Sequence, residues 1–360
     1  MFMEISLCMI VKDEEDVLER CLECAKNIAD EIVIVDTGSK DRTKDIANKY
    51  TDKVYDFNWC NDFSKARNYA FSKATKEYLM WLDADDVIND SEIKKINELK
   101  NEKQKYDVYM LKYNTAFDDY GNPTFSYYRE RILKNCNKAV WLGKIHEAIV
   151  PFGDVKYCDI SIEHRKLKIS DSKRNLRIYE DMNKNNEEFS PREKYYYGRE
   201  LFFNEKYEKA IDILEKFADD DKGWIENRAD ALKIVAFCYK YLNNYEKYIE
   251  TLLKCCIIHT PRADVCCELG NWFMEQNNFL QAIFWFKNAL NCEKDEFSGG
   301  FIESDYYGYI PCLQLCVCLD RIGRTKEAFY YNNKAGLYKE NSRAVEFNNE
   351  YFENKLKQEV

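Results

Sequence analysis

The stretch YLMWLDADD, residues 78–86, is an apolar run that ends in three aspartates within four positions. Its apolar half predicts a strand buried on both faces, because such strands read as continuous apolar runs. Carboxylates this close together repel one another unless water or a cation separates them. Where a strand ends, residues i and i+2 still point to one side, so Asp83 and Asp85 are expected to face one ligand while Ala84 turns into the sheet. The alternative is that these acids only cap a helix that begins near Ser91.

Upstream of this stretch the sequence alternates between strands and helices. Apolar runs predict strands at 4–11, 31–36, 53–57 and 77–82. Helical spacing of apolar residues predicts helices at 13–29, 40–50 and 62–74, the last with Asp62 as its N-cap. Downstream, we expect a helix at 91–100 and strands near 108–114, 125–134 and 155–163. These strands are expected to add antiparallel members to the sheet. The pattern predicts an α/β domain with a mostly parallel sheet covered by helices on both faces.

The second half of the chain is helical and repeats itself. Four similar segments carry a small-residue slot, which falls at Ala210, Tyr248, Ala282 and Ala328. These slots are 38, 34 and 46 residues apart, and a period near 34 with such a slot resembles the tetratricopeptide repeat. The second copy departs from the pattern, because it places Tyr248 in the slot. The sequence therefore predicts an all-α solenoid of about four imperfect repeats.

These two patterns divide the chain into four predicted segments. We expect the α/β domain over 1–165, a connecting helix or linker over 166–190, repeats over 191–342 and a C-terminal helical tail over 343–360.

Composition narrows the class of protein. The formal charge of −10 argues against a nucleic-acid binder, which usually needs a basic face. No apolar run approaches the length of a membrane span, and the N-terminal residues lack the features of a signal peptide. Fifteen cysteines without a secretory signal indicate a reduced, cytoplasmic chain that packs cysteine in its core, the Cys21–Cys24 CxxC pair included.

All four predicted N-terminal strands end in polar side chains, at VKDEE, VDTGSKD, FNWCNDFSKARN and LDADD. In an open parallel sheet, ligands bind outside the carboxyl ends of the strands. The chain has only twelve glycines and no GxGxxG or GKS/T motif, so it lacks the backbone cradle of many phosphate sites. A divalent cation held by the aspartates is therefore expected to neutralise a bound diphosphate.

Four blocks of this first half resemble the family 2 glycosyltransferases of GT-A fold. SLCMIVKDEE, DEIVIVDTGSKDRT, DFSKARNYAFSKAT and WLDADD stand in the family's order and are similar to its bacterial branch with C-terminal tetratricopeptide repeats. That branch includes the S-glycosyltransferases that modify bacteriocin peptides. The resemblance implies a metal-dependent, inverting transfer of a hexose from a UDP-sugar to a peptide or protein acceptor. The repeats would recruit that acceptor, or pair two subunits in a homodimer.

Transferred by position, the resemblance assigns the donor-binding residues. Val11 and Glu14 would flank the base and ribose, Asp36 would hold the uracil or ribose edge, and Arg67 would reach the base or diphosphate. Asp83 would contact ribose, and Asp85 would bind Mg²⁺ or Mn²⁺. The alternative for Arg67 is an arginine on a helix surface. For Ser39, Asp41 and Thr43, which follow Asp36, the favoured interpretation is a helix N-terminus.

Two further blocks, WLGKIHEAIV at 141–150 and ISIEHRK at 160–166, resemble the acceptor side of the family's site. His146 and Glu147 are the catalytic candidates there, and Glu147 would be the general base. The alternative is that Glu147 anchors its loop or pairs with Arg131. His164 would complete the metal site, although Arg165 follows it where the branch tends to have an aromatic-glycine pair.

Two other functions remain open at this point. One is a repeat scaffold whose first domain binds nucleotide without turnover. The other is a sugar nucleotidyltransferase, a class that usually carries a glycine-rich, basic loop where this chain has VKDEEDV.

Overall fold

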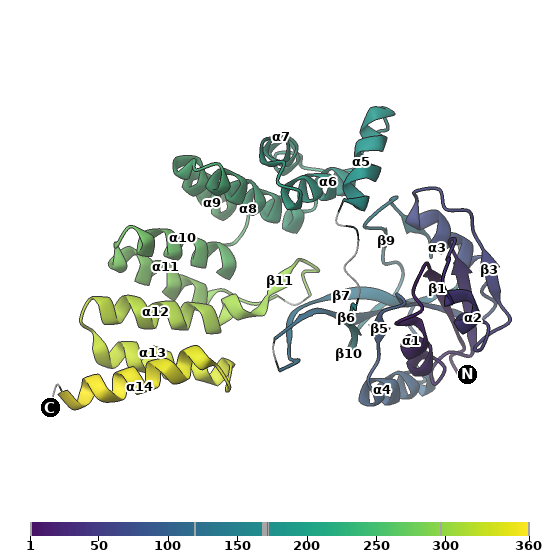
Figure 1. The fold of residues 1–360 in the computed structure, drawn as a ribbon, viewed down its shortest axis with the longest axis horizontal. Helices are drawn as coiled ribbons and strands as arrows, with labels where there is room; N and C mark the ends of the chain where they lie inside the picture. Colours follow the sequence, from purple (N-terminus) through teal and green to yellow (C-terminus); the bar gives the residue numbers. More distant parts are fainter. Residues whose placement is uncertain (1, 119, 168–170, 172, 296, 359–360) are drawn as a thin grey trace. The chain divides into compact units, whose positions relative to one another are not determined.

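The computed structural model describes residues 2–118, 120–167, 171, 173–295 and 297–358, and the chain forms two compact units (Figure 1). The first unit is Met1–Glu188 and the second is Phe189–Val360. The first is built around a twisted sheet and the second is helical, so the predicted fold class is confirmed. None of the described helices is both long enough and apolar enough to cross a lipid bilayer.

The sheet of the first unit has the strand order β3-β2-β1-β4-β7-β6-β10-β5. Its strands are β1 (Ile5–Val11), β2 (Glu31–Asp36), β3 (Val54–Asp56), β4 (Tyr78–Trp81), β5 (Asp86–Val87), β6 (Val108–Phe117), β7 (Pro123–Lys134) and β10 (Val155–His164). Strands β1 to β4 pair in parallel, as the apolar runs predict. Strand β7 runs antiparallel to β4 and β6, so the sheet gains the expected antiparallel member. Strand β10 instead pairs in parallel with β6 and brings His164 beside Asp86 of β5.

Two apolar cores cover the two faces of this sheet. On one face α1 and α4 pack over Ile5, Leu7 and Met9 of β1, and on the other face α3 packs against Cys8 of the same strand. Alternate residues of a strand point to opposite faces, so a strand buried on both must be apolar throughout. The helices of this unit are α1 (Leu18–Ala25), α2 (Thr43–Ala47), α3 (Phe63–Phe71), α4 (Asp90–Asn101) and α5 (Arg174–Lys184).

Helix α1 begins at Leu18, so the predicted helix over 13–29 is wrong at its start. Asp13 has a left-handed backbone (φ 54°), which a helix cannot contain. The backbone N–H of Asp13 donates to Ser39 Oγ at 2.9 Å and that of Glu14 to Thr43 Oγ1 at 2.7 Å. Side chains distant in sequence therefore hold residues 13–17 as a loop. Helix α3, in contrast, begins as predicted, because Asp62 accepts a hydrogen bond from the Lys65 N–H.

The second unit consists of helical hairpins followed by a last helix. Its helices are α6 (Pro191–Phe203), α7 (Tyr207–Ala218), α8 (Ile225–Tyr241), α9 (Tyr245–Ile258), α10 (Ala263–Glu275), α11 (Phe279–Asn291), α12 (Tyr309–Arg321), α13 (Thr325–Tyr338) and α14 (Arg343–Gln358). The four repeated segments are the second helices of the four hairpins, and all four slot residues are fully buried. Tyr248 fits its slot because its hydroxyl donates to Glu268 at 2.9 Å.

The 46-residue spacing between the last two slots has a structural cause. Between α11 and α12 the chain inserts a segment that contains the short strand β11 (Ile302–Glu303) and the 3-10 turn η1 (Ser304–Tyr307). We call residues 292–308 the insertion.

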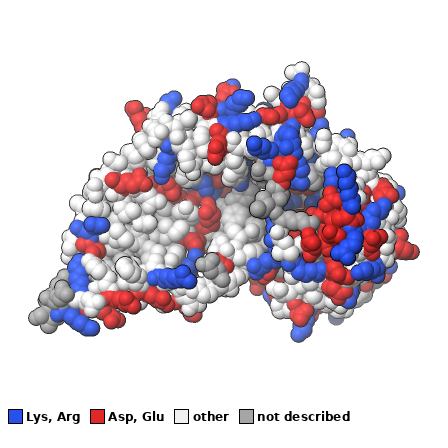
Figure 2. All heavy atoms as spheres, viewed as in Figure 1, with Lys and Arg blue, Asp and Glu red and all other residues white. Residues whose placement is uncertain are grey.

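Surface charge and cysteine state fit this architecture. Acidic and basic side chains are interspersed over the face of the first unit that Figure 2 shows. All fifteen cysteines are free, and ten of them are buried. The ten buried cysteines therefore serve as small apolar core residues, in agreement with the sequence-based interpretation.

Candidate active site

A cavity of about 680 Å³ lies where the strands of the first unit end. The loops after β1 and β4, the segment 145–147 and the end of β10 supply its polar lining. The residues expected from the sequence that line it are Val11, Glu14, Arg67, Asp83, Asp85, His146, Glu147 and His164. Eight of the nine predicted site residues therefore meet in one cavity, and only Asp36 does not line it.

The three aspartates that follow β4 have different roles in the structure. Asp83 and Asp85 line the cavity, and Ala84 is almost fully buried, as the strand geometry predicts. Asp86 is fully buried, and its Oδ2 accepts from Arg131 Nη1 and from the Asp83 backbone N–H, both at 3.0 Å. Asp86 is therefore an internal anchor that closes the turn 83–86.

Arg131 is the partner that Asp86 needs. Its side chain is fully buried, and its guanidinium lies over the rings of Trp81 at 3.6 Å and Tyr113 at 4.1 Å. An unpaired buried charge is very costly, so Arg131 and Asp86 are retained together. The alternative that Glu147 pairs with Arg131 is wrong.

Glu147 pairs instead with Arg67, which also binds Asp83. Arg67 Nε donates to Glu147 Oε1 at 2.6 Å, and Arg67 Nη2 donates to Asp83 Oδ1 at 2.7 Å. The guanidinium lies against the rings of Trp81 and Trp141, 5.1 and 4.8 Å from their centroids, and these two rings contact each other edge-on. Arg67 is buried, so the alternative of a surface arginine is wrong. It joins the strand end of β4 to the loop that carries Glu147.

These contacts determine the charge of the cavity. Burial alone would raise the pKa of Asp83, but the charges of Arg67 and Arg131 outweigh it and hold that pKa well below its usual range. Burial would lower the pKa of Arg67, but Asp83 and Glu147 hold it above its ordinary value. Asp83 therefore stays ionised and Arg67 stays protonated at neutral pH.

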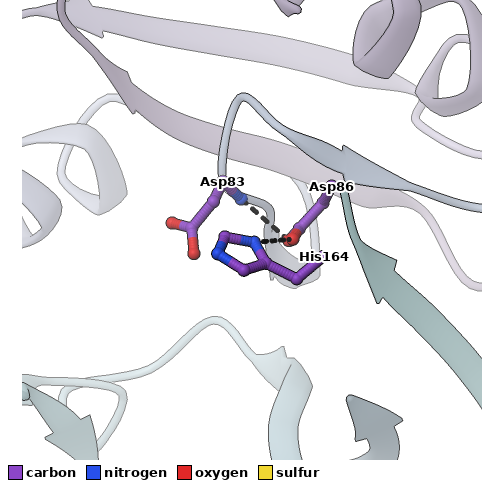
Figure 3. Close-up of side chains that lie close together, drawn as sticks. All are labelled: Asp83, Asp86 and His164. Atoms are coloured by element: carbon purple, nitrogen blue, oxygen red, sulfur yellow. Dashed lines mark hydrogen bonds and ion pairs between the residues drawn. The ribbon is translucent and has the colours of Figure 1, made fainter. Parts of the chain in front are cut away.

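His164 is the last residue of β10 and lies beside the aspartates. Its Nδ1 lies 3.1 Å from Asp85 Oδ1, 3.2 Å from Asp86 Oδ1 and 2.8 Å from the Tyr113 hydroxyl. Figure 3 shows the imidazole between the carboxylates of Asp83 and Asp86. Burial would lower the pKa of His164, but hydrogen bonds to Asp85 and Asp86 raise it to about 9.

The residues at this end of the cavity fit a divalent cation. Asp83, Asp86 and His164 each offer a ligand atom, and these atoms lie within 4.8 Å of one another. Because Asp86 is buried and bound to Arg131, the groups that face the cavity are Asp83, Asp85 and His164. Carboxylate oxygens and an imidazole nitrogen suit Mn²⁺, and the carboxylates alone suit Mg²⁺. A metal would bind the neutral imidazole, so its binding would release a proton from His164.

Asp36 organises the loop beside the cavity. It is buried, and its Oδ1 accepts from the N–H groups of Gly38 and Ser39, both at 2.9 Å. Gly38 has φ 106°, a conformation that favours glycine. Asp36 Oδ2 is buried and accepts no hydrogen bond from the described residues. Ser39 and Thr43, together with Asp41, hold the loop after β1 through their side chains.

The segment 141–150 forms the wall that carries His146 and Glu147. Strands β8 (Trp141–Leu142) and β9 (Ala148–Ile149) pair antiparallel and enclose a loop with Gly143 at φ 91°. His146 has φ 49°, and its ring stacks on Tyr179 of α5 with a 6.4 Å centroid separation. This backbone turn carries Glu147 to Arg67.

Sequence reasoning missed several residues of this site. Trp59 and Phe63 line the cavity with ring centroids 4.7 Å apart, and Arg174 of α5 lies over Phe63 at 4.8 Å. The aromatic pair in FNWCNDF is a signal that could have found the first two. Tyr113 and Arg131 lie in apolar strands and carry no local signal.

Part of the chain is similar in sequence to known proteins. The family model described as Glycosyl transferase family 2 matches residues 6–150. The chain is 27% identical to the SPbeta prophage-derived glycosyltransferase SunS of Bacillus subtilis over 257 residues, 67% of this chain and 60% of SunS. It is 47% identical to the TPR repeat-containing protein Synpcc7942_0270 of Synechococcus elongatus over 85 residues, 24% of this chain and 21% of that protein. The chain thus spans less than two thirds of these relatives.

Solved structures give a more distant likeness. S. aureus TarS 1-349 in complex with UDP-GlcNAc is 15% identical, with a TM-score of 0.41 over 69% of this chain and 90% of TarS.

Proposed function

We propose that the chain transfers a hexose from a UDP-sugar to a peptide or protein acceptor, because the family model described as Glycosyl transferase family 2 matches residues 6–150. One observation carries this proposal. A single cavity brings together two cavity-facing aspartates, a histidine and, through Arg67, a glutamate on the opposite wall. The aspartates and the histidine could hold a metal-bound diphosphate, and the glutamate could take a proton from an acceptor.

The donor end of the cavity has suitable chemistry for a nucleoside diphosphate sugar. Asp85 and His164 would hold Mg²⁺ or Mn²⁺, which when bound offsets the charge that develops on the leaving diphosphate. The carboxylate of Asp83 is ionised and partly exposed, so it can accept hydrogen bonds from ribose hydroxyls. The unpaired Asp36 Oδ2 is an acceptor of the kind that a base N–H requires. Val11 and Glu14 line the cavity near this loop.

The transfer step is proposed as a direct displacement. The acceptor nucleophile forms a bond to the anomeric carbon, and the bond from that carbon to the diphosphate oxygen breaks on the opposite side. The configuration at the anomeric carbon is thereby inverted. Glu147 receives the acceptor proton as general base. Arg67 holds the carboxylate of Glu147 in place, and His146 borders it in the cavity.

The two other functions predict different behaviour. A nucleotide-binding scaffold would bind UDP with metal and release no sugar from any donor. A nucleotidyltransferase would make a UDP-sugar from a sugar phosphate and a nucleoside triphosphate. Release of UDP from a panel of UDP-sugars separates the proposed transferase from both.

The metal assignment is tested by Asp85→Ala with Asp52→Ala, an exposed carboxylate outside the cavity, as control. Titration calorimetry with UDP and MnCl₂ should show binding to the wild type and the control, and none to Asp85→Ala. Unchanged binding by Asp85→Ala would refute the role of Asp85. Failure of the wild type to bind UDP at any metal concentration would refute the donor class.

A further inference from the structure

The insertion, residues 292–308, walls a second cavity, which lies within the repeat unit. We call this space of about 760 Å³ the insertion cavity. Its other walls are the start of α8, the α9–α10 loop, the start of α10 and the C-terminal half of α11. The residues used below are Glu226, Phe284, Trp285, Glu293, Asp295 and Tyr307, all of which line it. The volume lies within the range of ligand-binding cavities. A repeat of regular length would lack this wall.

The insertion is tied to the hairpin beneath it by Arg262. Arg262 Nη2 donates to the carbonyl of Phe301 at 2.8 Å and to Asp264 Oδ2 at 3.1 Å. Glu226 accepts from His259 Nε2 at 2.9 Å and lies 3.6 Å from Arg262 Nη1. Among the described residues, the charged groups at the base of the cavity are therefore paired with one another.

The rim of the insertion cavity, in contrast to its base, carries acidic side chains. Glu293 and Asp295 are exposed and line the cavity, whereas Lys294 between them does not line it. Asp295 Oδ1 accepts from the Phe297 N–H at 2.9 Å and keeps its charge toward the rim. The whole chain carries a formal charge of −10, which adds to the negative potential at this rim. A cationic group is the complement of such a rim, whereas a nucleotide or an acidic peptide would be repelled.

The remaining wall is aromatic and continues outside the cavity. Phe284 is 55% exposed and Leu280, one turn earlier on α11, is 69% exposed. Residues i and i+4 lie on one face of a helix, so these two side chains form an apolar strip that leads into the cavity. Trp285 and Tyr307 line the interior. An extended chain that carries apolar side chains fits this strip better than a compact small molecule.

We propose that the insertion cavity binds the acceptor, through a peptide segment in which a lysine or arginine stands next to an aromatic residue. The apolar side chain would enter between Phe284, Trp285 and Tyr307, and the cation would lie against Glu293 and Asp295. This inference rests on the proposed function, because the bound peptide segment would belong to the protein that is glycosylated. In this proposal the acceptor is selected by residues of the repeat unit, and these residues take no part in the transfer of the sugar.

The test uses defined peptides and the full chain. A fluorescein-labelled nonapeptide, Gly-Ser-Lys-Phe-Lys-Phe-Gly-Ser-Gly, is compared by anisotropy with one twin in which both lysines are glutamate and another in which both phenylalanines are serine. The first peptide should bind at least about ten times more tightly than either twin. Glu293→Gln combined with Asp295→Asn should weaken its binding about five- to tenfold, and Phe284→Ala should do the same. Glu250→Gln, an exposed carboxylate on α9, is the matched control and should change nothing.

Three results would overturn the proposal: equal binding of the charge-reversed twin, no effect of the rim variant, or displacement of the peptide by a neutral oligosaccharide such as chitotriose.

Release of UDP from UDP-sugars, measured on the same proteins, keeps the two proposals separate. The rim variant should release UDP at the wild-type rate. Peptide binding without donor turnover in the wild type would refute the proposed function alone. Donor turnover without selective peptide binding would refute the insertion cavity alone.

Discussion

At the scale of single residues, Arg67 joins two parts of the candidate active site. It pairs with Asp83 and with Glu147, which the proposed function assigns to the donor and the acceptor, and contact with two tryptophan rings restricts its guanidinium. A planar guanidinium can serve two carboxylates at once, whereas an ammonium group is a single point charge. In the proposed function, Arg67 is thus a positioning residue for Glu147.

Arg67→Lys tests this role. The variant keeps the charge but loses one of the two contacts, so kcat for transfer should fall about 10- to 100-fold with little change in KM for the UDP-sugar. Initial-rate kinetics at varied donor concentration measures both constants. Arg42→Lys, on the exposed surface, serves as control. A raised KM with unchanged kcat would show that Arg67 acts on the donor itself.

Glu31 gives a prediction about pH. Burial alone would raise its pKa, but hydrogen bonds from Lys53, Ser6 and Thr75 lower it to about 2, from an ordinary value of 4.5. A lowered pKa means that the carboxylate stabilises the fold fully above pH 4.5 and loses this contribution as pH falls toward 2.

Glu31→Gln should therefore lower the free energy of unfolding at pH 7 by about 1–3 kcal/mol. The difference from wild type should shrink between pH 4.5 and 2. Urea denaturation at pH 7, 4.5 and 3 measures this difference. A gap that is constant across these pH values would contradict the account.

Sequence reasoning could not separate the three aspartates by role. Asp83, Asp85 and Asp86 lie within four residues of one another, so their sequence neighbours are nearly the same. The burial of Asp86 depends on Arg131, which is 45 residues away. Asp36 does not line the cavity for a related reason, because its contacts to Gly38 and Ser39 turn its Oδ1 toward its own loop. Burial and partners of a side chain are long-range properties, which local spacing does not encode.

At the scale of elements, the apolar periodicity predicted the strands and repeats well because it records burial directly. The N-cap of α3 could also be predicted from the sequence, since Asp62 and the Lys65 N–H that it caps lie only three residues apart. The start of α1 was not, because the loop before it is held by Ser39 and Thr43. Neighbouring residues in the sequence predict where a helix begins only when the contact that fixes this start lies between those same neighbours.

Gly270 gives a prediction at this scale. A Cβ at this position of α10 would meet Phe286 of α11 at 2.6 Å, in the middle of a hairpin. Alanine favours a helix over glycine, yet Gly270→Ala should lower the unfolding free energy by about 1–3 kcal/mol because the ring must move. Gly336→Ala on α13 meets Val345 only at 3.3 Å, so thermal denaturation of that variant should show a smaller loss. Equal effects would argue against packing as the cause.

At the scale of the whole molecule, the two units divide the work in the proposed function. The donor cavity is lined only by residues before position 176, and the insertion cavity only by residues after 225. Each cavity therefore lies inside one compact unit.

A chain that ends at Glu188 tests this division. It should bind UDP with Mn²⁺ and release UDP from a UDP-sugar, because it keeps every residue of the first cavity. It should not glycosylate a protein acceptor. Titration calorimetry and mass spectrometry of the acceptor measure the two properties, and full acceptor modification by the shortened chain would show that the repeats do not recruit it.

The place of β10 in the sheet bears on biosynthesis. The chain leaves the ribosome from its N-terminus, and β10 is the last strand of the first unit to emerge, yet it lies between β6 and β5. His164, its final residue, meets aspartates that were translated about eighty residues earlier. A nascent polypeptide that stops short of this strand lacks His164 at the cavity, so in the proposed function nucleotide binding would begin only after β10 has been translated.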